Sequence, residues 1–140
     1  MANQSFDVII IGGGPAGYPA AIRASQLGLT ACVVERDKLG GVCVNIGCIP
    51  TKALLHSAAM ANSIRKEAKE LGIEVGEVKT DYGVAMKRSR KVAEQNSKGA
   101  EFLMKKNKVT VIKGTGVLAS ATTVKVGDDI TSGARVGSVG

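Results

Sequence analysis

Two cysteines, Cys43 and Cys48, are the residues of this chain best suited to chemistry. They lie in the segment Gly-Gly-Val-Cys-Val-Asn-Ile-Gly-Cys-Ile-Pro-Thr-Lys, residues 40–52. In an ideal helix, Cα atoms five positions apart are separated by about 8 to 9 Å, whereas a disulfide needs less than about 7 Å. A bridge between the two cysteines would therefore require a distorted turn, for which Gly47 provides backbone freedom. Because a strained disulfide exchanges readily, we interpret the pair as a redox switch.

Other roles for the histidine and cysteine residues are weaker. A buried structural pair or a metal site remains open for Cys43 and Cys48, although C-x-x-x-x-C is not the usual zinc spacing and the sequence has no second ligand pair. We predict no metal. The single histidine, His56, is expected on a helix surface, and Cys32 in an apolar run is expected to be a small core residue.

A glycine motif precedes the cysteine segment. Residues 6–11 form a β-branched apolar run typical of a buried parallel strand, and Gly-Gly-Gly-Pro-Ala-Gly follows at residues 12–17. This fits G-x-G-x-x-G, in which the first glycine turns the chain, the second admits a pyrophosphate and the third permits close helix packing. A second strand, residues 30–34, ends at Glu35, the acid expected to bind a ribose hydroxyl. A turn without a ligand, with Glu35 as an ordinary surface acid, is the alternative.

The remaining pattern predicts further elements of an α/β fold. A helix is expected from Pro15 to Gly28, kinked locally at Pro19. Further helices are predicted over residues 51–71 and 82–106, with strands at residues 108–113 and 122–126.

Composition restricts the class of protein. The chain has 140 residues, 44% of them hydrophobic, which suits one domain or part of one. Its net charge of +7 is interpreted as a solvated helix face, and with 3% aromatic residues we predict no nucleic-acid binding. No apolar run approaches the roughly 20 residues of a membrane span. The first residues do not resemble a secretory or transit peptide, and three cysteines favour a reducing compartment, so we expect a cytoplasmic protein.

The glycine motif followed by the paired cysteines resembles the class I pyridine nucleotide-disulfide oxidoreductases. The family pattern for the redox segment is satisfied throughout residues 40–52. Residues 49, 51 and 53–57 look like the dihydrolipoamide dehydrogenase branch, and glutathione or mercuric reductases usually differ there.

This resemblance implies a Rossmann-like FAD-binding fold with a parallel sheet, incomplete relative to the family. It implies that Cys43 is the thiol that exchanges with the substrate and that Cys48 faces the flavin. Lys52, four residues after Cys48, would lie on the same helix face, beside the flavin ring. The expected FAD contacts are Gly12, Gly14, Pro15, Ala16, Gly17, Glu35, Arg36, Gly41, Val42, Lys52 and Gly116.

The resemblance also implies how far the chain extends into the family. Residues 1–126 are expected to be the N-terminal part of the FAD-binding domain, and residues 127–140 a divergent or truncated tail. No second glycine fingerprint follows, so NAD-binding and dimerisation domains are expected to be absent.

The parent reaction implied by the family oxidises dihydrolipoamide, carried by the acyl carrier of a 2-oxo acid dehydrogenase complex, through the cysteine pair and FAD to NAD. The full-length parent would be a homodimer, and this chain alone is expected to be inactive. A member similar to glutathione or mercuric reductase, or a non-catalytic flavin-binding fragment, is the alternative.

Overall fold

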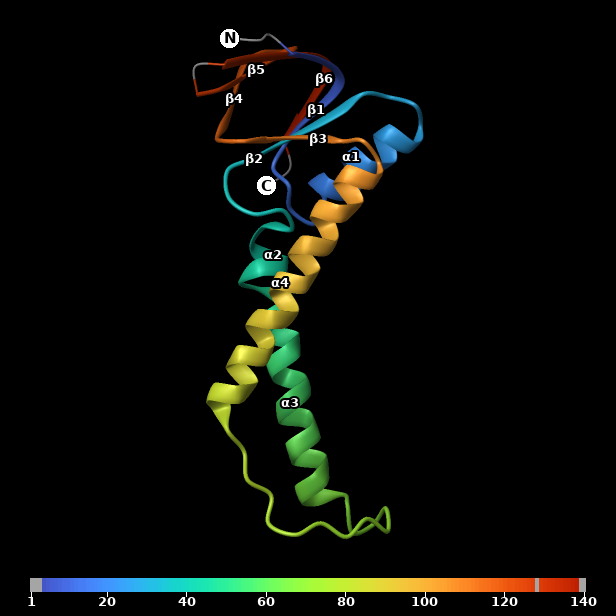
Figure 1. The fold of residues 1–140 in the computed structure, drawn as a ribbon, viewed down its shortest axis with the longest axis vertical. Helices are drawn as coiled ribbons and strands as arrows, with labels where there is room; N and C mark the ends of the chain where they lie inside the picture. The colour runs from blue at the N-terminus through green and yellow to red at the C-terminus, as the bar shows by residue number, and fades with distance from the viewer. Residues whose placement is uncertain (1–3, 128, 139–140) are drawn as a thin grey trace.

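The chain folds into one six-stranded sheet with helices against one face (Figure 1). The computed structural model describes residues 4–127 and 129–138, the latter by backbone only. The elements are β1 (Gln4–Ile11), α1 (Gly17–Gln26), β2 (Ala31–Glu35), α2 (Gly41–Asn45), α3 (Cys48–Lys66), α4 (Tyr82–Lys106), β3 (Thr110–Lys113), β4 (Gly116–Ser120), β5 (Thr123–Val126) and β6 (Asp129–Ser138).

The strand order is β3-β2-β1-β6-β5-β4. The first four strands run parallel, with Ile10 opposite Val33 and Val33 opposite Val111. Strand β5 is antiparallel to both β6 and β4. The predicted parallel α/β sheet is therefore confirmed, and it carries an antiparallel hairpin at one edge.

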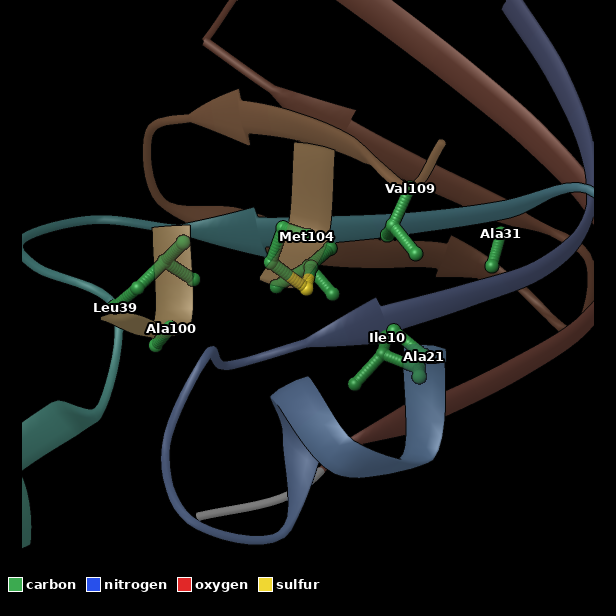
Figure 2. Packing of buried hydrophobic residues seen from close by; sticks show 8 residues of the cluster. Ile10, Ala21, Ala31, Leu39, Ala100, Met104 and Val109 are labelled. Carbon is green, nitrogen blue, oxygen red and sulfur yellow. The ribbon is translucent and has the colours of Figure 1, made fainter. Parts of the chain in front are cut away.

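Alternate residues of β1 and β2 divide the core between the two faces of the sheet, as the period of two in a strand requires. The side chains of Ile10 and Val33 lie on the face of the sheet that α1 and α4 cover, where Met104 is almost fully buried. Figure 2 shows Ile10 beside Ala21 of α1 on this face. On the other face, a second buried cluster joins residues of β1 and β2 to residues of β5. Its members are Ile9, Cys32, Val34, Val124 and Val126.

The helices confirm much of the sequence pattern and correct some of its boundaries. Helix α4 has the predicted bounds, with Asp81 as N-cap accepting a hydrogen bond from the Val84 amide. Helix α3 begins three residues earlier than predicted and ends at Lys66, before the predicted end at Leu71, which is 67% exposed. Pro19 lies in the first turn of α1, where a missing N–H costs little.

Helices α3 and α4 lie side by side and extend away from the sheet (Figure 1). The segment between them, residues 67–81, forms the far end of this projection. Within the described residues, no helix combines the length and apolar character needed to cross a membrane.

Strand β6 lies in the segment after Val126, for which the sequence pattern predicts no element. Its backbone pairs in parallel with β1 along nearly the whole strand, from Gln4 opposite Thr131 to Ile11 opposite Ser138. The sheet ladder is made by backbone groups, so a segment rich in small residues can join it without an apolar alternation that would indicate a strand. Residues 128, 139 and 140 of the expected tail lie outside the described residues.

Candidate redox and dinucleotide site

The glycine turn between β1 and α1 has the backbone geometry that its motif predicts. Gly12 adopts φ +106°, a left-handed value that favours glycine, and its amide donates to the Val34 carbonyl at 2.8 Å. A Cβ atom on Gly17 would overlap the Gly12 carbonyl oxygen. A Cβ atom on Gly14 would have no heavy atom within 4 Å. Gly12 and Gly17 therefore shape the turn, and Gly14 leaves an open approach to its backbone.

Glu35, at the end of β2, reaches this turn with its carboxylate. Its Oε2 atom accepts a hydrogen bond from the Gly13 amide at 2.7 Å, and Oε1 accepts one from the Asp37 amide at 2.8 Å. Each carboxylate oxygen retains further acceptor capacity for a ligand hydroxyl. The predicted ribose-binding acid thus lies beside the predicted pyrophosphate turn.

Gly13 is a residue of this turn that motif reasoning missed, because it occupies an unrestricted position of G-x-G-x-x-G. A Cβ atom there would lie 2.6 Å from Leu39 Cδ2 and 3.2 Å from Glu35 Oε2. The signal in the sequence is that a fourth glycine stands at a position where the motif allows any residue.

The cysteine segment is attached to the glycine turn through its own two glycines. The Gly40 amide donates to the Gly13 carbonyl at 2.8 Å. Gly41 adopts φ +58°, and a Cβ atom on it would come within 3.0 Å of Gly14 Cα. The backbones of the two motifs, separated by over twenty residues, are therefore in contact.

Cys43 and Cys48 form a disulfide, with Cα atoms 4.6 Å apart. Cys43 lies in α2 and Cys48 is the first residue of α3, so the helix is interrupted between them. Gly47 makes this interruption with φ −112° and ψ −106°, and its amide donates to Val42 O at 2.7 Å. The predicted distortion of the turn is confirmed.

The two cysteines differ in their surroundings. Cys43 is half-buried, whereas Cys48 is exposed at the N-terminus of the 19-residue helix α3. Unpaired amides and the helix dipole at such an end stabilise negative charge, including that of a thiolate. Lys52 follows one turn later on α3 and is exposed. The start of α3 therefore gives Cys48 a setting that stabilises negative charge.

The remaining residues predicted to contact FAD differ in their exposure. Pro15 and Ala16 are exposed before α1, Arg36 is exposed after β2, and Val42 is 69% exposed on α2. Gly116 begins β4, where a Cβ atom would lie 3.1 Å from Val34 Cγ1. Packing alone explains that glycine, and its flavin contact stays a prediction.

The residues expected to have no role in the chemistry are found where the sequence places them. His56 is exposed on α3. Cys32 is fully buried in β2, and burial raises the pKa of its thiol to about 12. Within the described part of the chain, no three histidine, cysteine or acidic side chains are grouped so that they could hold a metal ion.

A cavity of about 570 Å³ lies beside Glu35, within the range typical of small-molecule sites. It is formed where the end of β2 meets β3 and α4. Sequence reasoning missed most of its lining, because the α4 residues are far from the glycine motif in the chain. The lining residues are Glu35, Asp37, Lys38, Leu39, Glu101, Met104, Lys105, Val109, Val111 and Lys113.

Comparison with known proteins agrees with this geometry. The family model described as pyridine nucleotide-disulphide oxidoreductase matches residues 6–136. The chain therefore belongs to the pyridine nucleotide-disulphide oxidoreductase family, which confirms the resemblance inferred from the motifs.

Its relatives include enzymes named dihydrolipoyl dehydrogenase. The protein of Mycobacterium tuberculosis is 55% identical over 121 residues, which are 86% of this chain and 26% of the relative. That of Chlorobaculum parvum is 50% identical over 125 residues, 89% of this chain and 26% of the relative. That of Corynebacterium glutamicum is 44% identical over 134 residues, 96% and 28% respectively. The chain thus spans about a quarter of the length of these relatives.

Proposed function

We propose that this chain supplies the FAD-binding turn and the redox disulfide of a dihydrolipoyl dehydrogenase. The observation that carries the proposal is the backbone contact between Gly41 of the cysteine segment and Gly14 of the glycine turn. A cysteine pair attached to a dinucleotide turn can, once a substrate has reduced it, pass electrons to a cofactor bound there. The names of the relatives favour lipoamide as the substrate class over glutathione or mercuric ion.

The residues of the turn fit FAD. The open side of Gly14 admits a pyrophosphate, and Glu35 retains acceptor capacity for a ribose hydroxyl. The neighbouring cavity has room for a nucleoside. Further contacts are assigned to Gly12, Pro15, Ala16, Gly17, Arg36, Gly41, Val42, Lys52 and Gly116. When bound, FAD supplies a two-electron acceptor for the reduced cysteine pair.

The cysteine pair exchanges electrons with a dithiol in two steps. A substrate thiolate attacks Cys43 Sγ, the Cys43–Cys48 bond breaks, and its electron pair remains on Cys48 as a thiolate. The second substrate thiol, losing its proton, attacks the mixed disulfide and releases the Cys43 thiolate. The substrate becomes a cyclic disulfide, the cysteine pair gains two electrons, and two protons are released or retained on the thiols. The N-terminus of α3 stabilises the thiolate at Cys48.

The wider assignment follows the relatives. The dithiol is dihydrolipoamide on the acyl carrier of a 2-oxo acid dehydrogenase complex, NAD is the final acceptor, and the full-length enzyme is a cytoplasmic homodimer. Residues 1–126 are assigned to the N-terminal part of the FAD-binding domain, and NAD-binding and dimerisation domains to the remainder of a longer enzyme. Because the chain spans about a quarter of its relatives, a flavin-binding part without turnover of its own is the second candidate.

Absorption spectroscopy tests the proposal. The purified chain is mixed with FAD, freed of unbound cofactor, and given one equivalent of dihydrolipoamide. We expect retained flavin and, on reduction, a long-wavelength band from a thiolate beside the flavin. The Cys48→Ser variant should retain flavin without that band. Failure to retain any flavin would contradict the assignment of the glycine turn, and persistence of the band in Cys48→Ser would contradict the role of Cys48.

A further inference from the structure

Helix α4 holds the cysteine segment through three side chains. Ser97 Oγ, which is buried, donates to the Leu39 carbonyl at 2.8 Å. Arg90 Nη1 donates to the Asn45 carbonyl at 3.4 Å, and Arg88 Nη1 donates to the Ala53 carbonyl at 3.2 Å. These acceptors lie before, between and after the two cysteines. One helix therefore fixes both halves of the interrupted turn.

The contact at Asn45 is the central one of the three. Asn45 is the last residue of α2, two positions after Cys43 and three before Cys48. Its side-chain amide donates to the Leu39 carbonyl at 3.1 Å and to the Gly41 carbonyl at 2.9 Å. Asn45 therefore organises α2 internally, and Arg90 connects this unit to α4. Of the three α4 side chains, only Arg90 contacts the backbone between the two cysteines.

The cysteine segment also has an unusual charge balance. Residues 38–66 contain no aspartate or glutamate, while Lys38 and Lys52 flank the disulfide in sequence. Helix α4 adds the guanidinium groups of Arg88 and Arg90.

Two acidic side chains of the neighbouring elements are already engaged elsewhere. Glu94 of α4 pairs with Lys98 at 2.6 Å, and Glu35 accepts two backbone amides at the glycine turn. The charged side chains within residues 38–66 and those of α4 that bond to this segment are therefore basic.

We propose that Arg90 is a positioning residue that sets the redox equilibrium of the Cys43–Cys48 pair. It holds the end of α2 in place and brings a permanent positive charge to the turn between the cysteines, which favours the thiolate produced when the disulfide is reduced. The inference rests on the dithiol exchange of the proposed function. Because Arg90 is exposed, we expect an effect of about two- to fivefold on the equilibrium, the size typical of solvent-screened charges.

The test measures the equilibrium between the chain and dihydrolipoamide at defined ratios of reduced to oxidised lipoamide, without added flavin. Samples are quenched in acid, unfolded and alkylated, and the oxidised fraction is counted by mass. Cys32 adds one constant label. The Arg90→Gln variant should shift the equilibrium about two- to fivefold toward the disulfide. Arg90→Lys, which retains the charge, should recover most of the wild-type value.

Lys91→Gln is the matched control, because Lys91 is exposed on the same helix and carries the same charge. It should leave the equilibrium unchanged. Equal shifts in Lys91→Gln and Arg90→Gln, or no shift in Arg90→Gln, would overturn the inference. If the wild-type disulfide resists dihydrolipoamide at every ratio, the proposed function fails as well, so the two failures are distinguishable.

Salt dependence provides a measurement that does not depend on the variants folding. Raising the ionic strength from a low value to about 1 M screens exposed charges. The unmutated chain should then shift toward the disulfide, in the same direction as Arg90→Gln. An equilibrium unaffected by salt would contradict an electrostatic role of Arg90.

Discussion

Gly41 and Gly14 lie so close that a Cβ atom on Gly41 would come within 3.0 Å of the Gly14 Cα atom. This contact joins two motifs that are read separately in the sequence, a cysteine pair and a dinucleotide turn. The nearby hydrogen bond from the Gly40 amide to the Gly13 carbonyl holds the same two segments together. The segment of the disulfide and the glycine turn are thereby held together at one end of strand β1.

Substituting Gly41 by alanine should damage this junction. The residue has φ +58°, which costs an L-residue about 1 to 3 kcal/mol, and its new Cβ would press on Gly14. We expect a corresponding loss in the free energy of unfolding, measured by urea denaturation, together with weaker FAD retention. Gly99→Ala in α4, where a Cβ meets no heavy atom within 4 Å, should instead stabilise by about 0.5 to 1 kcal/mol. Wild-type stability in Gly41→Ala would refute the described contact.

Two alanine substitutions in the glycine turn should separate folding from cofactor binding. Gly17→Ala would force a Cβ against the Gly12 carbonyl oxygen, and we expect loss of the cooperative unfolding transition. Gly14→Ala meets no heavy atom, so it should fold with wild-type stability while its methyl group blocks the approach of a pyrophosphate. Circular dichroism and FAD titration together distinguish the outcomes. Undiminished FAD binding in Gly14→Ala would remove the assigned role of Gly14.

Local patterns predicted a large part of the fold, because apolar periodicity and turn residues act over short distances. Strands β1 and β2, helix α4 and the break between Cys43 and Cys48 all depend on neighbouring residues. Strand β6 was not predicted, because it pairs through backbone groups and has no apolar alternation. Its partner β1 lies more than a hundred positions away in the chain.

In the candidate site, too, features set by neighbouring residues were predicted and contacts between distant segments were not. The glycine turn, Glu35 and the cysteines each carry a signal in residue type and spacing. The contacts of Arg90 with Asn45 and of Ser97 with Leu39 carry none, because an arginine or a serine within a helix does not indicate its partner. Such contacts depend on how α4 packs against α2, which the pattern of one helix does not determine.

Replacing Glu35 should affect both the turn and the cofactor. Glu35→Ala leaves the Gly13 and Asp37 amides without the carboxylate, and we expect a cost of about 1 to 3 kcal/mol with strongly reduced FAD affinity. Glu35→Gln retains one acceptor oxygen and should be milder in both respects. FAD titration and urea denaturation give the two readings. Glu70→Gln, an exposed acid in the turn after α3, serves as control and should change neither.

The buried thiol of Cys32 should make the chain less stable at alkaline pH. Burial raises the pKa of this thiol from 9.0 to about 12, so the folded state keeps the proton after the unfolded state has lost it.

The free energy of unfolding contributed by this group is therefore complete below about pH 9 and falls toward about pH 12, by at most about 1.4 kcal/mol per pH unit. Urea midpoints of wild type and Cys32→Ala, compared at about pH 8 and about pH 10, should converge as the pH rises, since only the wild type carries this titration. A difference between the two proteins that stays constant with pH would show that the thiol titrates alike in both states.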